Sequence, residues 1–142
     1  MRLWHKDLIP VLPKQQLIAQ WRECCLIAHE INDKGTPNHV LVNKVLNYPI
    51  EHFYRYGRRI YNEMCRRGYD PNWFRFNKYF RMFLSAEYEQ DAIFDTWHND
   101  RYLTQCFYNL QEKYDCGGIP DDEWRKLEDL YYETIPTPNR GT

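Results

Sequence analysis

Two adjacent charged residues, Arg22 and Glu23, lie inside a run whose apolar residues recur every three or four positions. A carboxylate in such a place can stabilise developing positive charge and transfer protons. The pair also fits a purely structural role, in which Glu23 lies on the solvated edge of a helix and pairs with a nearby cation. The residue types and spacing alone favour the structural role.

The other potentially reactive side chains give weaker indications of catalytic or metal-binding chemistry. Cys24 and Cys25, with His29 close by, would fit a metal site or a thiol nucleophile, but both cysteines fall on the apolar side of the run, which favours buried structural thiols. The five cysteines are odd in number and form no CxxC pair, so we expect no disulfide framework, zinc ribbon or iron–sulfur cluster. The histidines lack ligand spacing, and no glycine-rich phosphate loop, GxSxG or HExxH occurs. We therefore expect no metal and no organic cofactor.

The hydrophobic pattern predicts an all-α fold with three main helices, shorter helices and an extended N-terminal segment. Pro13 and Pro49 are well placed to begin helices, and Gly68 is well placed to end one. Asp121 or Asp122 is expected to cap the last helix. The main helices are predicted over 13–31, 49–67 and 91–114 and the short ones over 38–47 and 121–132, while 1–12 is expected to be extended or irregular and 70–90 is ambiguous.

A chain of 142 residues is long enough for one domain, which we place at 1–135, followed by a flexible tail at 136–142. Hydrophobic residues make up 43% of the chain, enough for a packed core. No apolar run approaches the ~18–20 residues of a membrane span, and the chain does not begin with a signal peptide. We expect a soluble, cytoplasmic protein that does not bind membranes.

The net charge of −1 conceals an uneven distribution. Residues 1–82 hold 14 Lys and Arg against 7 Asp and Glu, a charge of +7, whereas 83–142 hold 5 against 13, a charge of −8. The basic part could bind a polyanion such as nucleic acid, or the acidic part could fold against it and neutralise it. On the predicted helix 49–67, Arg66 and Arg67 favour a role in binding, whereas Arg55 favours a solvated face.

Two segments resemble the pyrimidine-dimer DNA glycosylase family, typified by phage endonuclease V, and are most similar to its bacterial branch. The first runs from MRLWH at the start of the chain to QQLIAQWRECC at 15–25. The second is YNEMCRRGY at 61–69, similar to the family's helix that ends in a basic pair, a glycine and an aromatic residue. The resemblance covers roughly residues 1–70 and is weak beyond them.

The resemblance implies a repair enzyme that acts on damaged double-stranded DNA, expected to be a monomer. The nucleophile would be the α-amine of Met1, whose reference pKa of ~7.7–8.0 leaves roughly a tenth in the free-base form at pH 7. Through an imine it would release the base and then break the strand by β-elimination, with Glu23 as the catalytic carboxylate. The DNA-binding residues that the resemblance implies are Arg2, Arg22, Arg66, Arg67 and Lys113.

The chain departs from the family in three ways, and these leave alternatives open. Arg2 is large enough to block removal of the initiator methionine, so Met1 would carry the nucleophile. Cys24 and Cys25 stand where the family enzyme has a further Arg soon after the catalytic Glu. The C-terminal third is acidic and would repel DNA. The alternatives are a glycosylase for another base lesion and a non-catalytic DNA- or protein-binding module, in which Glu23→Gln would change nothing measurable.

Overall fold

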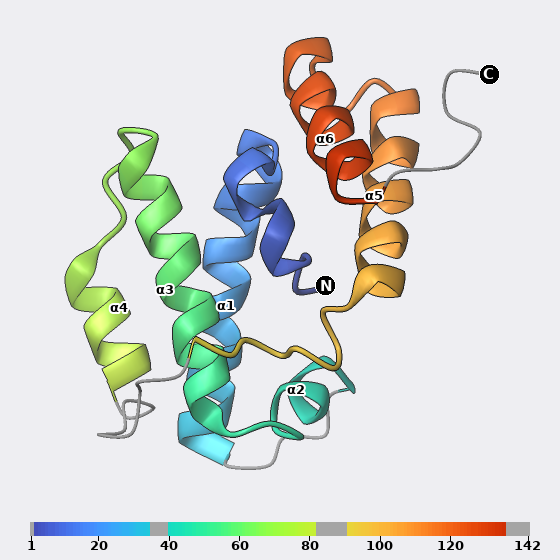
Figure 1. Ribbon diagram of the computed structural model, residues 1–142. Helices are drawn as coiled ribbons and strands as arrows, with labels where there is room; N and C mark the ends of the chain where they lie inside the picture. Colours follow the sequence, from blue (N-terminus) through green and yellow to red (C-terminus); the bar gives the residue numbers. More distant parts are fainter. Residues whose placement is uncertain (1, 35–39, 82–90, 136–142) are drawn as a thin grey trace.

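A computed structural model describes residues 2–34, 40–81 and 91–135, and all the regular elements in these ranges are helical (Figure 1). The all-α prediction is therefore confirmed. None of the described helices is long and apolar enough to cross a membrane. The elements are the 3-10 helix η1 (Lys6–Val11) and the α-helices α1 (Lys14–Lys34), α2 (Val40–Val45), α3 (Ile50–Arg66), α4 (Trp73–Phe80), α5 (Asp100–Asp115) and α6 (Asp121–Thr134).

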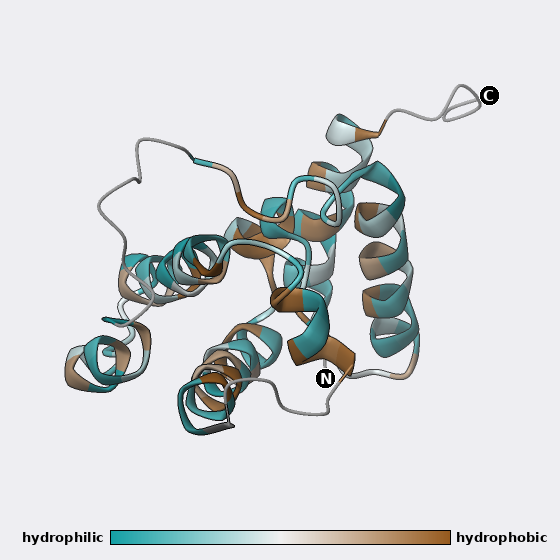
Figure 2. Cartoon of the chain, turned by 90° about the horizontal axis from the view of Figure 1, so that it is seen from below, coloured by the Kyte–Doolittle hydropathy of each residue, from teal (hydrophilic) through white to brown (hydrophobic). Residues whose placement is uncertain are grey.

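Helices α1, α3 and α4 pack together around aromatic side chains, and Figure 2 shows them nearly end-on as a group of three. Trp21 of α1 stacks on Phe76 and Phe80 of α4, with ring centroids 6.0 and 6.5 Å apart. Helix α3 begins after Pro49 and ends before Gly68, whose φ of +85° suits glycine. Both of these helix ends agree with the sequence prediction.

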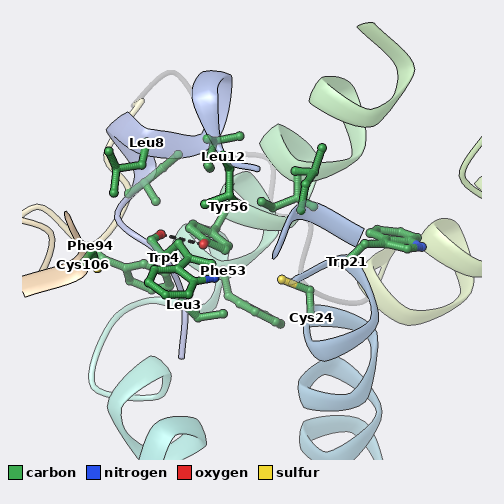
Figure 3. Packing of buried hydrophobic residues seen from close by; sticks show 14 of the residues in the cluster. Leu3, Trp4, Leu8, Leu12, Trp21, Cys24, Phe53, Tyr56, Phe94 and Cys106 are labelled. Atoms are coloured by element: carbon green, nitrogen blue, oxygen red, sulfur yellow. Dashed lines mark hydrogen bonds between the residues drawn. The ribbon is translucent and has the colours of Figure 1, made fainter. Parts of the chain in front are cut away.

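The N-terminal segment enters the core beside α1 and α3. Leu3, Leu8 and Leu12 are fully or almost fully buried. The Tyr56 hydroxyl of α3 donates a hydrogen bond to the Trp4 carbonyl at 2.6 Å, drawn as a dashed line in Figure 3. From α5, the Tyr102 hydroxyl donates to the Leu3 carbonyl, also at 2.6 Å. Residues 3 and 4 are thus held by hydrogen bonds from both α3 and α5.

Helices α5 and α6 form a hairpin that completes the core. The rings of Phe107 and Tyr131 stack with centroids 4.0 Å apart, and Trp124 stacks on Phe107 at 5.1 Å. Gly117, with φ of +82°, permits the turn that ends α5. This hairpin places the last turn of α5, which carries Lys113, near α1.

Three predictions about local structure were wrong. Residues 6–11 are not extended, because the His5 side chain accepts a hydrogen bond from the Asp7 N–H and starts η1. Residues 91–99 are not helical: Phe94 has φ of +50°, and the Asn99 side chain caps α5 by accepting from the Tyr102 N–H. The buried Ile93, Phe94 and Trp97 reproduce helical spacing within an irregular segment.

The third error concerns the cap of α6. The N-cap residue is Pro120, and no side chain caps the helix, so neither Asp121 nor Asp122 is the cap. Both lie in the first turn, where their charge complements the helix dipole. In the ambiguous region 70–90 the structure describes α4 and leaves 82–90 outside the described residues. The predicted tail at 136–142 also lies outside them.

Candidate active site around Glu23

The side chain of Gln20 joins Glu23 to the N-terminal segment. Its Nε2 donates to the Arg2 carbonyl at 3.0 Å and to Glu23 Oε2 at 3.1 Å. Its Oε1 accepts from the Trp4 N–H at 2.8 Å and lies 3.0 Å from the Tyr56 hydroxyl, whose single proton it shares with the Trp4 carbonyl. Gln20 is fully buried and lies one helical turn before Glu23, so the amide has one fixed orientation. The backbone of residue 2 therefore lies beside the Glu23 carboxylate.

Glu23 is partly buried, and its surroundings alter its acidity. Burial raises the pKa of the Glu23 carboxyl, although the positive charge of Arg22 acts in the opposite direction. The hydrogen bond from Gln20 stabilises the ionised form. A carboxylate with a raised pKa that lines a groove is suited to accept and return a proton.

Glu23 opens onto a groove of about 510 Å³. The groove has two cationic side chains, Arg22 and Lys113, and the ring of Trp4 forms part of its wall. The Gln16 Oε1 atom is buried without a hydrogen-bond partner among the described residues, which leaves an acceptor in the wall. The lining residues are Trp4, Gln15, Gln16, Ile18, Ala19, Arg22, Glu23 and Lys113.

The structure thus brings together several residues that the sequence singled out. Arg22, Glu23 and Lys113 line one groove, although Lys113 lies 90 residues away along the chain. Trp4 lines the same groove, and the guanidinium carbon of Arg2 lies 5.4 Å from the centroid of the Trp4 ring. Met1 lies outside the described residues.

Arg66 and Arg67 lie elsewhere. Both donate to the carboxylate of Glu63, which is buried, and Arg67 Nε lies 2.7 Å from Glu63 Oε2. Their guanidinium groups also donate to the carbonyl of Pro10 at the end of η1. These contacts join α3 to η1, and the pair lines a separate groove together with residues of α6. A DNA-binding role for Arg66 and Arg67 remains a prediction.

The thiols next to Glu23 are structural, as the sequence indicated. Cys24 and Cys25 are buried and unbridged. Burial raises the pKa of the Cys25 thiol to about 11 and that of Cys24 well above its ordinary value, so neither forms a thiolate readily. Within the part of the chain that the structure describes, no group of three His, Cys, Asp or Glu side chains could hold a metal ion.

Sequence reasoning missed the role of Gln20. The signal available was its position, three residues before Glu23 at the border of the apolar stripe, where a polar residue would be unusual unless it had partners. Its actual partners come from residues 2, 4 and 56, and no local pattern indicates those contacts.

Comparison with known proteins shows which family the chain belongs to. A family model described as pyrimidine dimer DNA glycosylase matches residues 1–76, just over half of the chain, including η1, α1 and α3. No curated protein matches the chain, and no solved structure matches it. The matched segment contains Arg22, Glu23 and the amide of Gln20 that joins Glu23 to the N-terminal segment. The chain belongs to the pyrimidine dimer DNA glycosylase family.

Proposed function

We propose that this protein removes pyrimidine dimers from double-stranded DNA and then cleaves the strand at the abasic site, through an imine between the α-amine of Met1 and C1′ of the damaged nucleotide. The observation that carries the proposal is the double hydrogen bond of Gln20 Nε2, at 3.0 Å to the Arg2 carbonyl and 3.1 Å to the Glu23 carboxylate. It holds the residue that follows Met1 beside the only acidic side chain that lines the groove among the described residues.

The first step exchanges one C–N bond for another. The lone pair of the Met1 amine forms a bond to C1′ while the bond from C1′ to the base breaks, and the base takes the electron pair. The amine nitrogen loses a proton, the C1′–O4′ bond opens, O4′ gains a proton, and a protonated imine remains. The Glu23 carboxylate stabilises the positive charge near C1′, accepts the amine proton and passes it to O4′, so that Glu23 is ionised again before the second step.

The second step breaks the strand. The imine acidifies the C2′ protons, and Glu23 accepts one of them. The electron pair forms a C2′–C3′ double bond, and the 3′ phosphate leaves with the C3′–O electrons. Arg22 and Lys113 at the groove would bind the phosphates on either side of the reacting sugar. Hydrolysis of the imine then returns the free amine.

Borohydride trapping tests the proposal directly. Untagged protein is mixed with a duplex that contains a cyclobutane dimer or an abasic site, in the presence of the reductant. We expect a covalent adduct that maps by mass spectrometry to Met1 and disappears when the amine is acetylated. Glu23→Gln should slow cleavage by about 100-fold or more, within the range for general acid–base catalysis. Trapping on a lysine, or unchanged cleavage by Glu23→Gln, would refute the mechanism.

A panel of lesion-bearing duplexes tests the substrate. We expect the single-turnover rate of base release to be highest for the cyclobutane dimer. A higher rate on an oxidised or ring-opened base would keep the chemistry and change the substrate. Binding without any cleavage or trapping would identify a non-catalytic DNA-binding protein.

A further inference from the structure

One face of α1 continues from the Glu23 groove to a second groove. The first groove is lined on this face by Gln15, Ile18 and Arg22, and the second by Arg22 and His29. Arg22 lines both, so the two grooves are consecutive parts of one surface. From position 15 to position 29, this surface is about 21 Å long at the rise of an α-helix.

The second groove lies between α1 and α4 and has a volume of about 270 Å³. Its cationic side chains are Arg22 from α1 and Arg75 from α4, both exposed. The apolar part of its wall includes Leu26, which is 56% exposed although it is a large hydrophobic residue. Arg75 and Cys25 line this groove together, and the positive charge of Arg75 partly offsets the effect of burial, which raises the pKa of the Cys25 thiol.

The two arginines retain their charge for a ligand. Among the residues that the structure describes, neither guanidinium group has an ion-pair partner within 4.0 Å or a hydrogen-bond acceptor. Of the nearby acids, Asp33 pairs with His29 at 3.0 Å, and Glu23 is held by Gln20. Arg22 also acts electrostatically on Glu23, but neither Arg22 nor Arg75 is engaged in an ion pair among the described residues, so both can attract an anion, and the planar guanidinium group suits phosphate.

We propose that the α1–α4 groove binds a backbone phosphate of the DNA strand that lies in the Glu23 groove, with Arg75 as its ligand and Arg22 shared between the two grooves. This inference rests on the proposed function. The distance along α1 from Arg22 to His29 is about 10 Å, which equals roughly three nucleotides at 3.4 Å per step. The phosphate therefore lies within about three nucleotides of the damaged sugar.

The first test measures the number of phosphate contacts. Glu23→Gln protein is titrated, across a series of salt concentrations, with a duplex that contains a tetrahydrofuran abasic analogue, which cannot form an imine. Adding Arg75→Ala should reduce the slope of log affinity against log salt by about 0.9, the value for one lost phosphate contact. Arg59→Ala removes an exposed arginine from α3 that lines neither groove, and it should leave the slope unchanged.

The second test locates the phosphate. Single phosphates near the abasic analogue are replaced by neutral methylphosphonates, one per duplex. We expect the methylphosphonate at one position, within about three nucleotides of the abasic analogue, to weaken binding several-fold when the protein retains Arg75. The same methylphosphonate should have no effect on binding by the Arg75→Ala variant. The proposal would be overturned if Arg75→Ala left the salt slope unchanged. It would also be overturned if, at every position, the methylphosphonate weakened binding by the same factor with and without Arg75. Failure of the Glu23→Gln protein to bind the duplex at all would instead refute the proposed function.

Discussion

Gln20 shows how one buried side chain determines the geometry of the site. Its amide uses both of its ends, with two acceptors for Nε2 and two donors for Oε1. Because the amide is fully buried, water cannot replace any of these partners without opening the core. Gln20 touches no reacting atom in the proposed mechanism, so we regard it as a positioning residue for Glu23 and for the N-terminal segment.

Replacing Gln20 with leucine should impair the reaction more than it impairs folding. The variant leaves the Trp4 N–H and the Arg2 carbonyl unpaired, so it should lose roughly 1–3 kcal/mol of stability for each unpaired group. Displacement of the N-terminal segment by about 1 Å should slow imine trapping by about 100-fold. Circular dichroism at the assay temperature verifies that the variant is folded. Gln105→Leu, on the exposed surface of α5, is the matched control and should trap at the normal rate.

The raised pKa of Glu23 predicts the acid side of the pH profile. The ionised carboxylate is the active form, and burial disfavours ionisation, so protonation begins at a higher pH than for an unperturbed glutamate, whose pKa is about 4.3. The single-turnover rate should therefore fall as pH is lowered through a midpoint above that value. In Gln20→Leu the midpoint should move higher still, because the carboxylate loses a donor. A midpoint at or below about 4.3 would contradict this assignment.

At the scale of elements, periodicity predicts the long helices well and the irregular segments poorly. Helices α1 and α3 begin one residue after Pro13 and Pro49, as the sequence indicated. The segment 91–99 misled the prediction because Phe94 and Trp97 are buried at helical spacing without helical backbone. Periodicity reports which residues are buried, and only tertiary contacts decide whether their backbone is helical.

In the candidate site, too, the sequence indicated some residues, and others depend on tertiary contacts. The resemblance to a family pointed to Arg22 and Glu23, and residue chemistry alone favoured a structural role for Glu23. Neither source pointed to Gln20, Tyr56 or the groove between α1 and α4. These depend on how residues 2–4 and 75 are placed against α1 in space, which the local sequence does not encode.

Gly57 is required by the close approach of α3 and α4. A Cβ atom at this position would lie 2.5 Å from Cε1 of Phe80. The Phe80 ring is fully buried and stacks on Phe76 with centroids 4.9 Å apart, so it has little room to move. Overpacking of about 1–3 kcal/mol should exceed the gain of about 1 kcal/mol in helix propensity.

We therefore expect Gly57→Ala to lower the thermal unfolding midpoint by roughly 5 °C, in line with domains of this size. Differential scanning calorimetry measures the midpoint. Arg59→Ala, two residues along the same helix and exposed, should shift it by less than about 2 °C. An unchanged or raised midpoint in Gly57→Ala would mean that Phe80 moves aside without loss of packing.

At the scale of the whole molecule, the acidic C-terminal part partly neutralises one basic region and leaves the other available. Asp122 and Glu123 at the start of α6 line the same groove as Arg66 and Arg67. At the Glu23 groove, by contrast, the α5–α6 hairpin contributes a cationic side chain, Lys113. The uneven charge along the chain is thus redistributed by folding, and the face around Glu23 is the better one for a polyanion.

Two lysines on the α5–α6 hairpin distinguish the two faces. Lys113 lines the Glu23 groove and Lys126 lines the groove of Arg66 and Arg67, and both are exposed. If DNA lies against Glu23, Lys113→Ala should weaken binding several-fold and reduce the salt slope by about 0.9, whereas Lys126→Ala should change neither. Fluorescence anisotropy with a labelled duplex on the Glu23→Gln background measures both quantities. The reverse result would place DNA against α6 and Arg66, although Arg66 and Arg67 already form ion pairs with Glu63. The DNA-binding face would then be separate from Glu23, the carboxylate that the chemistry requires.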